Sequence, residues 1–401
     1  MSSLPPLVSS DAIPAAPESG PDPSSIRYSR SVRLPGFGLA AQGRLSHARV
    51  VVVGAGGLGA PVIQYLAASG VGTLGIVDDD AVDESNLQRQ LLFGPAQLGV
   101  PKARAAAEWV RAQNPDVTVR VHATRLTEAT AELFDDYDLV VDGSDSFDTC
   151  YVVSDAAAER GLPVVWGSVS RFDGQVSVFW DAAPDGRGVD YRDLHPSPPA
   201  SGWDESCADV GVLSPLCGLV GSTMASEVVK LVTGVGEPLL GRVVTVDAAA
   251  GSWRESRLRR APDKEARRRA SIPSRDVSTP GAETAGVSIG ADVTADDLAT
   301  RLAARGAGTP GADFVLLDVR EPDEHDFAHI AGDVVAPGFG TRTLQRPDLD
   351  RAVPVVTYCA RGPRARAAAE LLAAEGYDVR VLHGGMLGWT LAGRGPAAAA
   401  G

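Results

Sequence analysis

Cys359 stands at the start of a short, positively charged loop. The loop reads CARGPR and lies between the apolar run 353–358 and the Ala- and Leu-rich run 364–377. These runs predict a strand and a helix, so backbone amides and the helix dipole should lower the pKa of the Cys359 thiol, as should Arg361 and Arg364. The same amides would stabilise a persulfide anion. We therefore expect Cys359 to accept and donate sulfur; the alternative is a buried core cysteine.

The segment GAGGLG at 54–59 matches the pattern G-x-G-x-x-G, between a β-branched run and a run with helical spacing. Gly54 and Gly56 would let the backbone turn tightly and approach a phosphate, and Gly59 would let the helix pack closely on the strand. Asp78, nineteen residues beyond Gly59, suits the ribose hydroxyls. By itself this pattern predicts a nucleotide or dinucleotide, with NAD as the default.

The stretch after this carboxylate favours a triphosphate. Arg89 and Lys102 supply cations, with Asn86 and Gln90 beside them in sequence. NAD needs few cations, whereas splitting ATP between its α and β phosphorus builds charge on the departing pyrophosphate. Asp145, in the segment DGSDSF, suits Mg²⁺. The alternative for the two cations is simple solvation at the surface.

The elements that must position these residues alternate between strand-like and helix-like runs. The strand-like runs 73–80 and 138–145 carry carboxylates at their C-terminal ends. This pattern predicts an α/β fold with a mostly parallel, Rossmann-like doubly wound sheet and ligands at the carboxyl ends of its strands. A second, smaller α/β block follows a linker rich in Pro, Gly and charge. We predict a disordered tail at 1–25, a nucleotide-binding domain at 26–260, a linker at 261–286 and the smaller domain at 287–401.

Composition narrows the class of protein. The chain has 401 residues, of which 44% are hydrophobic and 22% charged, and its formal net charge is −14. The negative charge disfavours nucleic-acid and membrane partners, and no apolar run approaches the roughly 20 residues that span a bilayer. Four scattered cysteines argue against a disulfide scaffold and favour the cytoplasm.

The first block resembles the MoeB/ThiF relatives of E1 enzymes, which adenylate ubiquitin-like sulfur carriers. The resemblance covers about 26–258 and rests on ordered motifs: RYSRSVRLPGFG (27–38), GAGGLG, SNLQRQLLF (85–93), PKA (101–103), SRFDGQVSVF (170–179) and SCADVGVLSPLCGLVGS (206–222). It implies an E1/ThiF-type fold, ATP and Mg²⁺, and a substrate that is the C-terminal glycine carboxylate of a small protein ending in Gly-Gly. It also implies a homodimer, in which Arg30 reaches the ATP of the partner subunit.

The residue patterns and the resemblance together predict the nucleotide site, and the resemblance itself implies Gly57, Asp78, 85–89, Lys102 and Asp145. The predicted positions are Gly54, Gly56, Gly57, Gly59, Asp78, Asp80, Ser85, Asn86, Leu87, Gln88, Arg89, Gln90, Lys102, Asp145 and Ser146. Arg89 and Asp145 are also expected to act in catalysis, and Asp145 to hold Mg²⁺. Ser146 and Cys150 stand where the family usually has Asn and Arg, which opens the alternative of a scaffold that has lost adenylation. Asp190 and Asp193 replace one cysteine pair of the family's zinc site, so we expect no structural zinc.

The other three cysteines have different expected roles. Cys207 occupies the position proposed to form a thioester in some fused relatives, although a structural role fits it equally well. Cys217 lies in an apolar, helix-like run, and Cys150 has no cation near it in sequence. We expect both to be structural.

The second block resembles a rhodanese over about 290–398. The motifs LLDVREPDEHDFAHIAG (316–332), C-x-x-G-x-R from Cys359 to Arg364, and LHGGMLGW (382–389) occur in order. The resemblance implies a sulfurtransferase whose donor is thiosulfate or a persulfide. Together, the two blocks predict ATP-dependent adenylation of a sulfur carrier followed by transfer of sulfur from Cys359 to give a thiocarboxylate. An NAD-dependent oxidoreductase with an accessory rhodanese is a weaker alternative.

Overall fold

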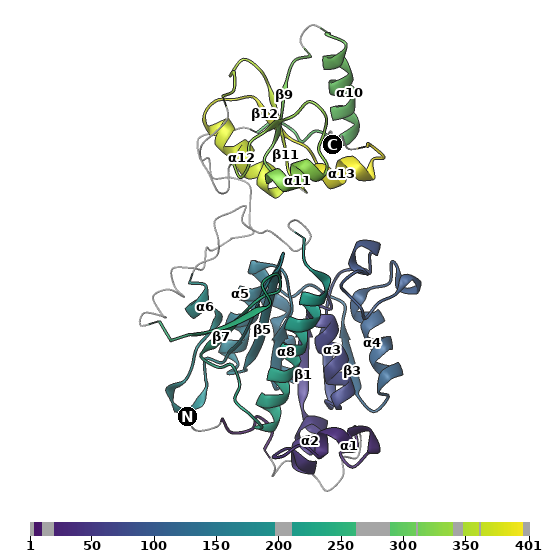
Figure 1. The fold of residues 1–401 in the computed structure, drawn as a ribbon, viewed down its shortest axis with the longest axis vertical. Helices are drawn as coiled ribbons and strands as arrows, with labels where there is room; N and C mark the ends of the chain where they lie inside the picture. Colours follow the sequence, from purple (N-terminus) through teal and green to yellow (C-terminus); the bar gives the residue numbers. More distant parts are fainter. Residues whose placement is uncertain are drawn as a thin grey trace. The chain divides into compact units, whose positions relative to one another are not determined.

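The computed structural model describes residues 4–9, 20–196, 211–261, 289–309, 312–339, 348–360 and 362–395. The chain divides into two compact units. The described residues up to 261 belong to the first unit and those from 289 onward to the second, and each unit has its own sheet (Figure 1). The predicted pairing of a large and a small α/β domain is confirmed. Cys207, Arg361 and the predicted linker beyond Ala261 lie outside the described residues.

The sheet of the first unit has eight strands in the order β3-β2-β1-β4-β5-β6-β7-β8. The first five strands in this order pair in parallel, and the last three join them antiparallel. The bounds are β1 Arg49–Val53, β2 Thr73–Val77, β3 Thr118–His122, β4 Leu139–Asp142, β5 Val164–Ser170, β6 Asp173–Phe179, β7 Arg242–Asp247 and β8 Ser252–Arg257. The parallel half brings the ends of β1, β2 and β4 to one edge, which is where the sequence predicted the nucleotide site.

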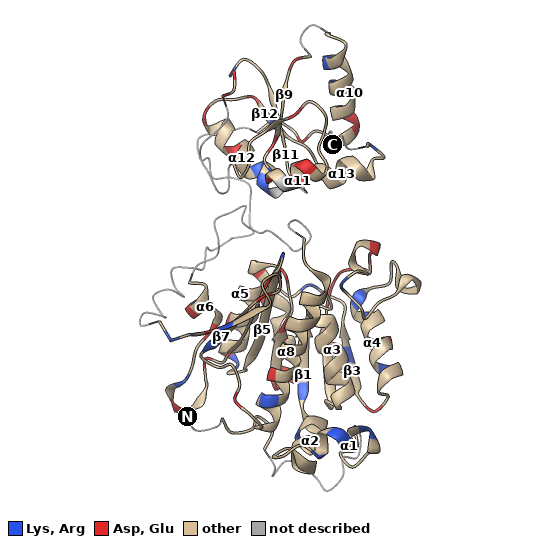
Figure 2. Cartoon of the chain, viewed as in Figure 1, with Lys and Arg blue, Asp and Glu red and all other residues tan. Residues whose placement is uncertain are grey.

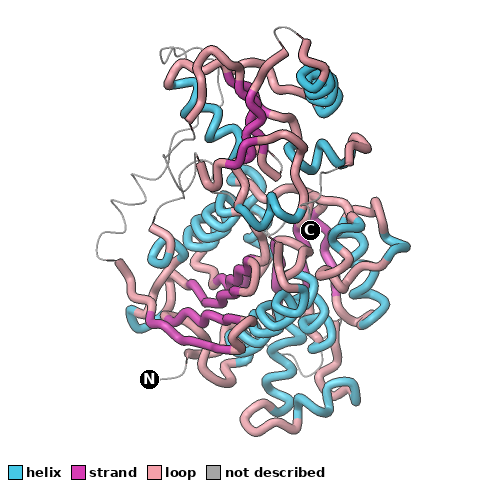
Figure 3. Tube along the Cα trace, turned by 45° about the horizontal axis from the view of Figure 1, so that its top comes forward, coloured by secondary structure: helices cyan, strands magenta, loops and turns pink. Residues whose placement is uncertain are grey.

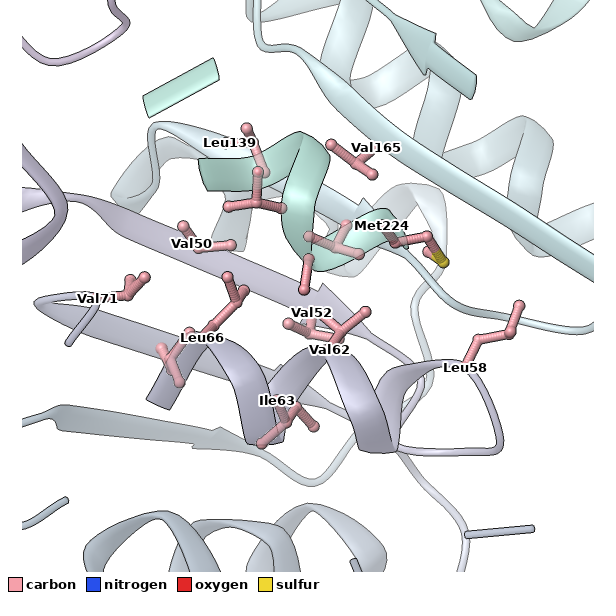
Figure 4. Close-up of a cluster of buried hydrophobic side chains, with 14 of the residues drawn as sticks. Val50, Val52, Leu58, Val62, Ile63, Leu66, Val71, Leu139, Val165 and Met224 are labelled. Carbon is pink, nitrogen blue, oxygen red and sulfur yellow. The ribbon is translucent and has the colours of Figure 1, made fainter. Parts of the chain in front are cut away.

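Helices cover both faces of this sheet because side chains of β1 alternate between two cores. Val50 and Val52 belong to the core with α2, α3, α4 and α8, whereas Val51 and Val53 belong to the core with α5 and α6 (Figure 4 shows the first). The helix bounds are α1 Ser29–Val32, α2 Gly38–His47, α3 Gly59–Ser69, α4 Lys102–Gln113, α5 Phe147–Glu159, α6 Tyr191–Leu194 and α8 Ser214–Thr233. Burial on both faces explains why the central parallel strands β1, β2 and β4 are mostly apolar, whereas β3 at the edge of the sheet carries polar residues.

Helix α8 is long and apolar enough to cross a membrane by length and composition alone. Its most apolar window is 61% buried inside the unit, and the helix contains the ion pair between Glu227 and Lys230. Leu216, Val220 and Met224 on this helix are buried in the core of the sheet. We therefore assign α8 as a core helix.

Part of the predicted N-terminal tail packs against the first unit. Leu4 is buried, and the amide of Leu7 donates a hydrogen bond of 3.0 Å to the carbonyl of Leu231 on α8. Pro6 lies beside Gly234, which ends the same helix. Disorder was expected from the Pro- and Ser-rich composition, but two leucines here find an apolar surface that the sequence does not reveal.

The second unit contains a parallel four-stranded sheet in the order β10-β9-β11-β12. Its strands are β9 Val315–Asp318, β10 Val334–Val335, β11 Val355–Tyr358 and β12 Val379–Val381, and its helices are α10 Ala295–Gly306, α11 Pro322–Phe327, α12 Pro363–Ala374 and α13 Gly385–Leu391. Figure 3 shows these strands among the helices of the unit. Val355 shares a core with α12, and Val356 and Tyr358 share one with α10 and α13. Cys359 follows β11 directly, as the sequence predicted.

Candidate active sites

The glycine loop turns sharply between β1 and α3. Gly54 has a φ of 86°, a left-handed conformation that favours glycine, and its amide donates to the carbonyl of Val77 on β2. A Cβ on Gly59 would lie 1.8 Å from the carbonyl oxygen of Gly54. The loop and the first turn of α3 thus touch backbone to backbone. This contact brings the N-terminus of α3 next to the end of β1, which is the arrangement that binds phosphate.

Asp78 joins the end of β2 to the glycine loop. Its carboxylate accepts hydrogen bonds from the amides of Ala55, at 2.7 Å, and Asp80, at 2.9 Å. Burial raises the pKa of Asp78, while the Ala55 amide and the charge of Lys102 oppose that rise. The half-buried carboxylate therefore lies within the predicted site and fixes the loop through one of its oxygens.

Lys102 is the first residue of α4 and points back toward β2. Its Nζ lies 2.8 Å from a carboxylate oxygen of Asp80, and the Lys102 side chain is 7% exposed whereas that of Asp80 is 69% exposed. Figure 2 shows this basic start of α4. A nearly buried ammonium held by one exposed carboxylate can exchange that partner for a phosphate, because the carboxylate can return to water.

The segment 85–90 lies against the glycine loop. A Cβ on Gly57 would lie 3.6 Å from side-chain carbons of Arg89, and a Cβ on Gly56 would lie 3.7 Å from Nε2 of Gln90. Arg89 donates to the carbonyl of Ser85 at 3.0 Å, and the hydroxyl of Ser214 donates to the carbonyl of Gln88. Oε1 of Gln90 is buried with no hydrogen-bond partner among the described residues. Such an orphaned acceptor beside a phosphate-binding loop fits a site that receives a ligand.

The end of β4 supplies a second group of polar side chains. Asp142 is 1% exposed, and its carboxylate accepts from the amide of Ser144 at 3.1 Å and from its hydroxyl at 2.6 Å. Burial raises the pKa of Asp142, and the neighbouring charge of Asp145 adds to the rise. Asp145 itself is exposed. An exposed carboxylate beside a second acidic group offers the oxygen ligands that Mg²⁺ prefers, so the donor set fits this ion.

Ser146 and the two buried cysteines have structural contacts. The hydroxyl of Ser146 accepts from the amide of Thr149 at 3.2 Å and so caps α5. Burial raises the pKa of Cys150 well above its usual value, and burial also raises that of Cys217, against the charge of Arg89. Cys217 faces the glycine loop, since a Cβ on Gly57 would lie 3.0 Å from its sulfur. Both thiols therefore agree with the expected packing role.

Arg30 lies away from the other predicted nucleotide-binding residues of its own chain. It is exposed on α1, directly after Tyr28 and Ser29. Tyr28 packs on Gly70, which ends α3, and its hydroxyl accepts from Asn114, which ends α4. The glycine loop and Lys102 lie at the opposite ends of those two helices. Arg30 can serve a nucleotide only across an interface.

The turn that begins α6 is closed by Asp190 and Asp193. These are the two positions where the resemblance places one cysteine pair of the family's zinc site. Asp190 accepts from the amide of Asp193 at 3.2 Å, and Asp193 accepts from the amide of Asp190 at 2.9 Å. The second oxygen of Asp193 accepts from the amide of Ala261 at 2.8 Å. This capping box holds the turn through carboxylates and amides.

Cys359 lies in the loop between β11 and α12, where the sequence placed it. The Gly362 amide donates to its sulfur at 3.0 Å, and Gly362 has a φ of 131°, which few other residues adopt. The start of α13 holds the loop from the other side, since Met386 donates to the carbonyl of Cys359 at 2.8 Å. Pro363 is the first residue of α12, where its missing N–H would have no helical partner in any case. Cys359 is 1% exposed and shares an apolar core with α12, a burial that the alternative of a core cysteine also predicts.

Arg364 forms an ion pair that the sequence did not predict. Its terminal nitrogens donate to the two carboxylate oxygens of Glu324 on α11, at 2.7 and 2.8 Å. Burial would raise the pKa of Glu324, but hydrogen bonds from Arg364 and the Glu321 amide lower it overall. The acidic α11 thus meets the basic start of α12 (Figure 2). The acidic run PDEHD was the available signal for this partner.

Comparisons with known proteins agree with these two sites. The model of the ThiF family matches residues 28–267, and that of the rhodanese-like domain matches 294–392. The probable adenylyltransferase/sulfurtransferase MoeZ of Mycobacterium tuberculosis is 44% identical over an alignment of 406 positions, gaps included, which covers 96% of this chain and 96% of the relative. The sulfur carrier protein adenylyltransferase of Thermus thermophilus is 48% identical over 238 residues, which cover 59% of this chain and 88% of the relative.

A solved structure supports the fold of the first unit. A crystal structure of Escherichia coli MccB with a MccA variant has a TM-score of 0.53 at 20% identity, and covers 62% of this chain and 76% of that one. The match of the family model over more than half of the residues, and the likeness to MoeZ along nearly the whole length, lead to one conclusion. The chain belongs to the ThiF family and carries a rhodanese-like domain on its C-terminal side.

Proposed function

We propose that this chain is an adenylyltransferase and sulfurtransferase that activates the C-terminal glycine of a small ubiquitin-like sulfur-carrier protein. The observation that carries the proposal is the joint presence of the glycine loop with Asp78 and Lys102 in one unit and the Cys359 cradle in the other. The likeness to MoeZ spans both units. The thiosulfate or persulfide donor, the carrier's Gly-Gly end and a homodimer belong to the same proposal.

The first unit would turn a poor electrophile into a good one. The carrier carboxylate attacks the α phosphorus of ATP, which forms a mixed anhydride with AMP and releases pyrophosphate. Lys102 and Arg89 would stabilise the charge on the pyrophosphate, and the amides at the start of α3 would receive the phosphates. Asp145 would hold Mg²⁺, which when bound neutralises phosphate charge. Asp78 would hold the ribose through the remaining acceptor capacity of its carboxylate oxygens, each of which already accepts one backbone amide.

The second unit would supply the sulfur nucleophile. Cys359 takes a sulfane sulfur from the donor and becomes a persulfide, whose terminal sulfur attacks the activated carbonyl and displaces AMP. A thiol reductant then cleaves the acyl disulfide, which releases the thiocarboxylate and leaves a disulfide between Cys359 and the reducing thiol. Cys207 is a candidate for receiving the carrier's acyl group from the adenylate as a thioester, which the persulfide would then attack in place of the adenylate. A further reduction regenerates Cys359.

Mass spectrometry of the carrier tests the whole sequence. The full chain is incubated with Mg-ATP, thiosulfate, a thiol reductant and a candidate carrier that ends in Gly-Gly. Replacement of one oxygen by sulfur adds about 16 Da to the carrier, and this gain should vanish with Cys359→Ala while ATP–pyrophosphate exchange continues. ATP–pyrophosphate exchange with the carrier reports the first half-reaction separately. If no candidate carrier supports ATP–pyrophosphate exchange, the result would favour a scaffold that binds carriers without activating them.

A further inference from the structure

The second unit contains a cluster of three metal-ligating side chains that the sulfur chemistry does not use. His325 lies on α11, His329 lies two residues beyond the end of that helix, and Asp333 directly precedes β10. One ligand atom from each of these three side chains lies within 4.8 Å of the other two. The imidazole rings of the two histidines stack, with centroids 4.2 Å apart and planes 13° from parallel. We propose that His325, His329 and Asp333 bind one divalent transition-metal ion of the zinc class.

The hydrogen bonds around the cluster prepare its ligand atoms. Nδ1 of His329 lies 3.2 Å from the carbonyl oxygen of His325 and donates to it, which leaves the lone pair on Nε2 of His329. Nε2 of His325 lies 3.3 Å from Oδ1 of Asp333. The hydroxyl of Tyr358 donates to the other oxygen, Oδ2. A backbone carbonyl behind one imidazole and a hydroxyl behind the carboxylate are the partners that orient ligands in metal sites.

Burial favours an ion at this position. The side chain of Asp333 is 5% exposed and that of His325 is 18% exposed. Burying the Asp333 carboxylate costs it the hydration of its charge. A hydrogen bond from a neutral histidine compensates only part of that cost, whereas a cation bound between the carboxylate and the two imidazoles would compensate more of it. Two imidazole nitrogens and one carboxylate oxygen form a ligand set suited to Zn²⁺, Co²⁺ or Ni²⁺, with at least one coordination position left for water or an added ligand. This set differs from the four-cysteine site whose absence the sequence predicted.

The site is structurally linked to the sulfur loop without touching it. Tyr358 and Cys359 are consecutive and point to different cores, so the metal cluster and the thiol lie on opposite faces of the sheet. Helix α11 carries both His325 and Glu324, and Glu324 holds Arg364. An ion bound to His325 would therefore fix the helix that positions Arg364. It would act on the structure of the unit rather than on the sulfur.

Cobalt absorption tests the site directly. The untagged full chain is freed of metal by a chelator and titrated with Co²⁺, and the visible d–d bands are followed until Zn²⁺ displaces them. One equivalent of Co²⁺ should bind to the wild type. His325→Phe keeps an aromatic ring in the stack but removes the ligand, and His329→Gln removes the second imidazole. Loss of an outer-shell partner already weakens metal binding by about tenfold to a hundredfold, so each loss of a ligand should weaken it by at least that much.

Two controls separate this site from other ligands. His383→Ala removes a histidine whose side chain is 77% exposed in the same unit, and Cys359→Ala removes the reactive thiol. Both variants should bind Co²⁺ as the wild type does. Thermal unfolding of each metal-free variant establishes that it is folded. Wild-type binding by folded His325→Phe, loss of binding in Cys359→Ala, or no bands in the wild type with excess Co²⁺ would each overturn the proposal.

Discussion

Glu324 and Arg364 stand 40 residues apart in the chain and meet through two parallel hydrogen bonds of 2.7 and 2.8 Å. Paired donors of this kind fix the plane of the guanidinium group as well as its distance. Arg364 is nearly buried at 6% side-chain exposure, so Glu324 compensates a charge that has little water. The loop that cradles Cys359 is therefore anchored to α11 at its last residue.

Replacing Glu324 by Gln should disturb sulfur transfer without removing a reacting group. Gln replaces one of the two acceptor oxygens by an NH2 donor and carries no charge, so Arg364 loses its paired hydrogen bonds and its fixed orientation. We expect thiosulfate sulfurtransferase activity to fall by about tenfold to a hundredfold and the free energy of unfolding to fall by about 1–3 kcal/mol. Glu370→Gln, on the exposed side of α12, is the control and should change neither quantity. Equal effects of the two variants would contradict this role of Glu324.

The same pair should make the second unit sensitive to acid. The pKa of Glu324 is below its ordinary value of 4.5 in the folded state, so the folded protein binds its proton less readily than the unfolded chain does. Its contribution to stability is therefore complete above pH 4.5 and is lost as the pH falls through the lower folded-state pKa. Thermal unfolding of the wild type and Glu324→Gln at several pH values should show two curves that converge in acid. Curves that stay parallel as the pH falls would contradict a stabilising role of the ionised Glu324 carboxylate.

Glycine is required at position 59 by space rather than by backbone angle. A Cβ there would meet the carbonyl oxygen of Gly54 at 1.8 Å, and neither backbone can withdraw without opening the loop. We expect Gly59→Ala to lower the free energy of unfolding by about 3 kcal/mol or more and to abolish pyrophosphate exchange. In Gly218→Ala, the new methyl group meets nothing within 4 Å inside α8. That variant should be more stable by about 0.5–1 kcal/mol, and a loss of stability there would show that the packing around α8 is misjudged.

Arg30 and Lys102 allow a test of the proposed dimer by complementation. Arg30→Ala and Lys102→Met should each lose carrier-dependent pyrophosphate exchange, whereas Arg104→Met, exposed on the same helix as Lys102, should retain it. If Arg30 serves the partner's nucleotide, a mixed dimer of the two inactive variants has one intact site. After random subunit exchange, about a quarter of wild-type activity should return. Mass spectrometry verifies that mixed dimers have formed. Pyrophosphate-exchange activity that stays at zero in those dimers would contradict a site shared between subunits.

Local sequence patterns were sufficient to predict those parts of each site that directly follow a single strand. The β-branched run before Gly54 and the apolar run before Cys359 each predict a strand that ends in a loop, and the structure has both. Pairs that form only through the fold were not predictable in this way. Glu324 with Arg364, His325 with Asp333, and Leu7 with Leu231 depend on how distant segments pack, which propensity and spacing do not encode.

The hydrogen bonds of the turn at 190–193 affect the conditions under which this part of the first unit stays folded. Asp190 and Asp193 close this turn with each other's amides, and Asp193 also holds the amide of Ala261. Carboxylates of this kind are inert toward peroxide and disulfide reagents, whereas a thiolate cage is oxidised by both. The turn should therefore survive zinc starvation and oxidative stress alike. If Cys359 carries the sulfur as proposed, the first half-reaction should outlast the second under such stress, because a thiol that must become a persulfide is open to oxidation.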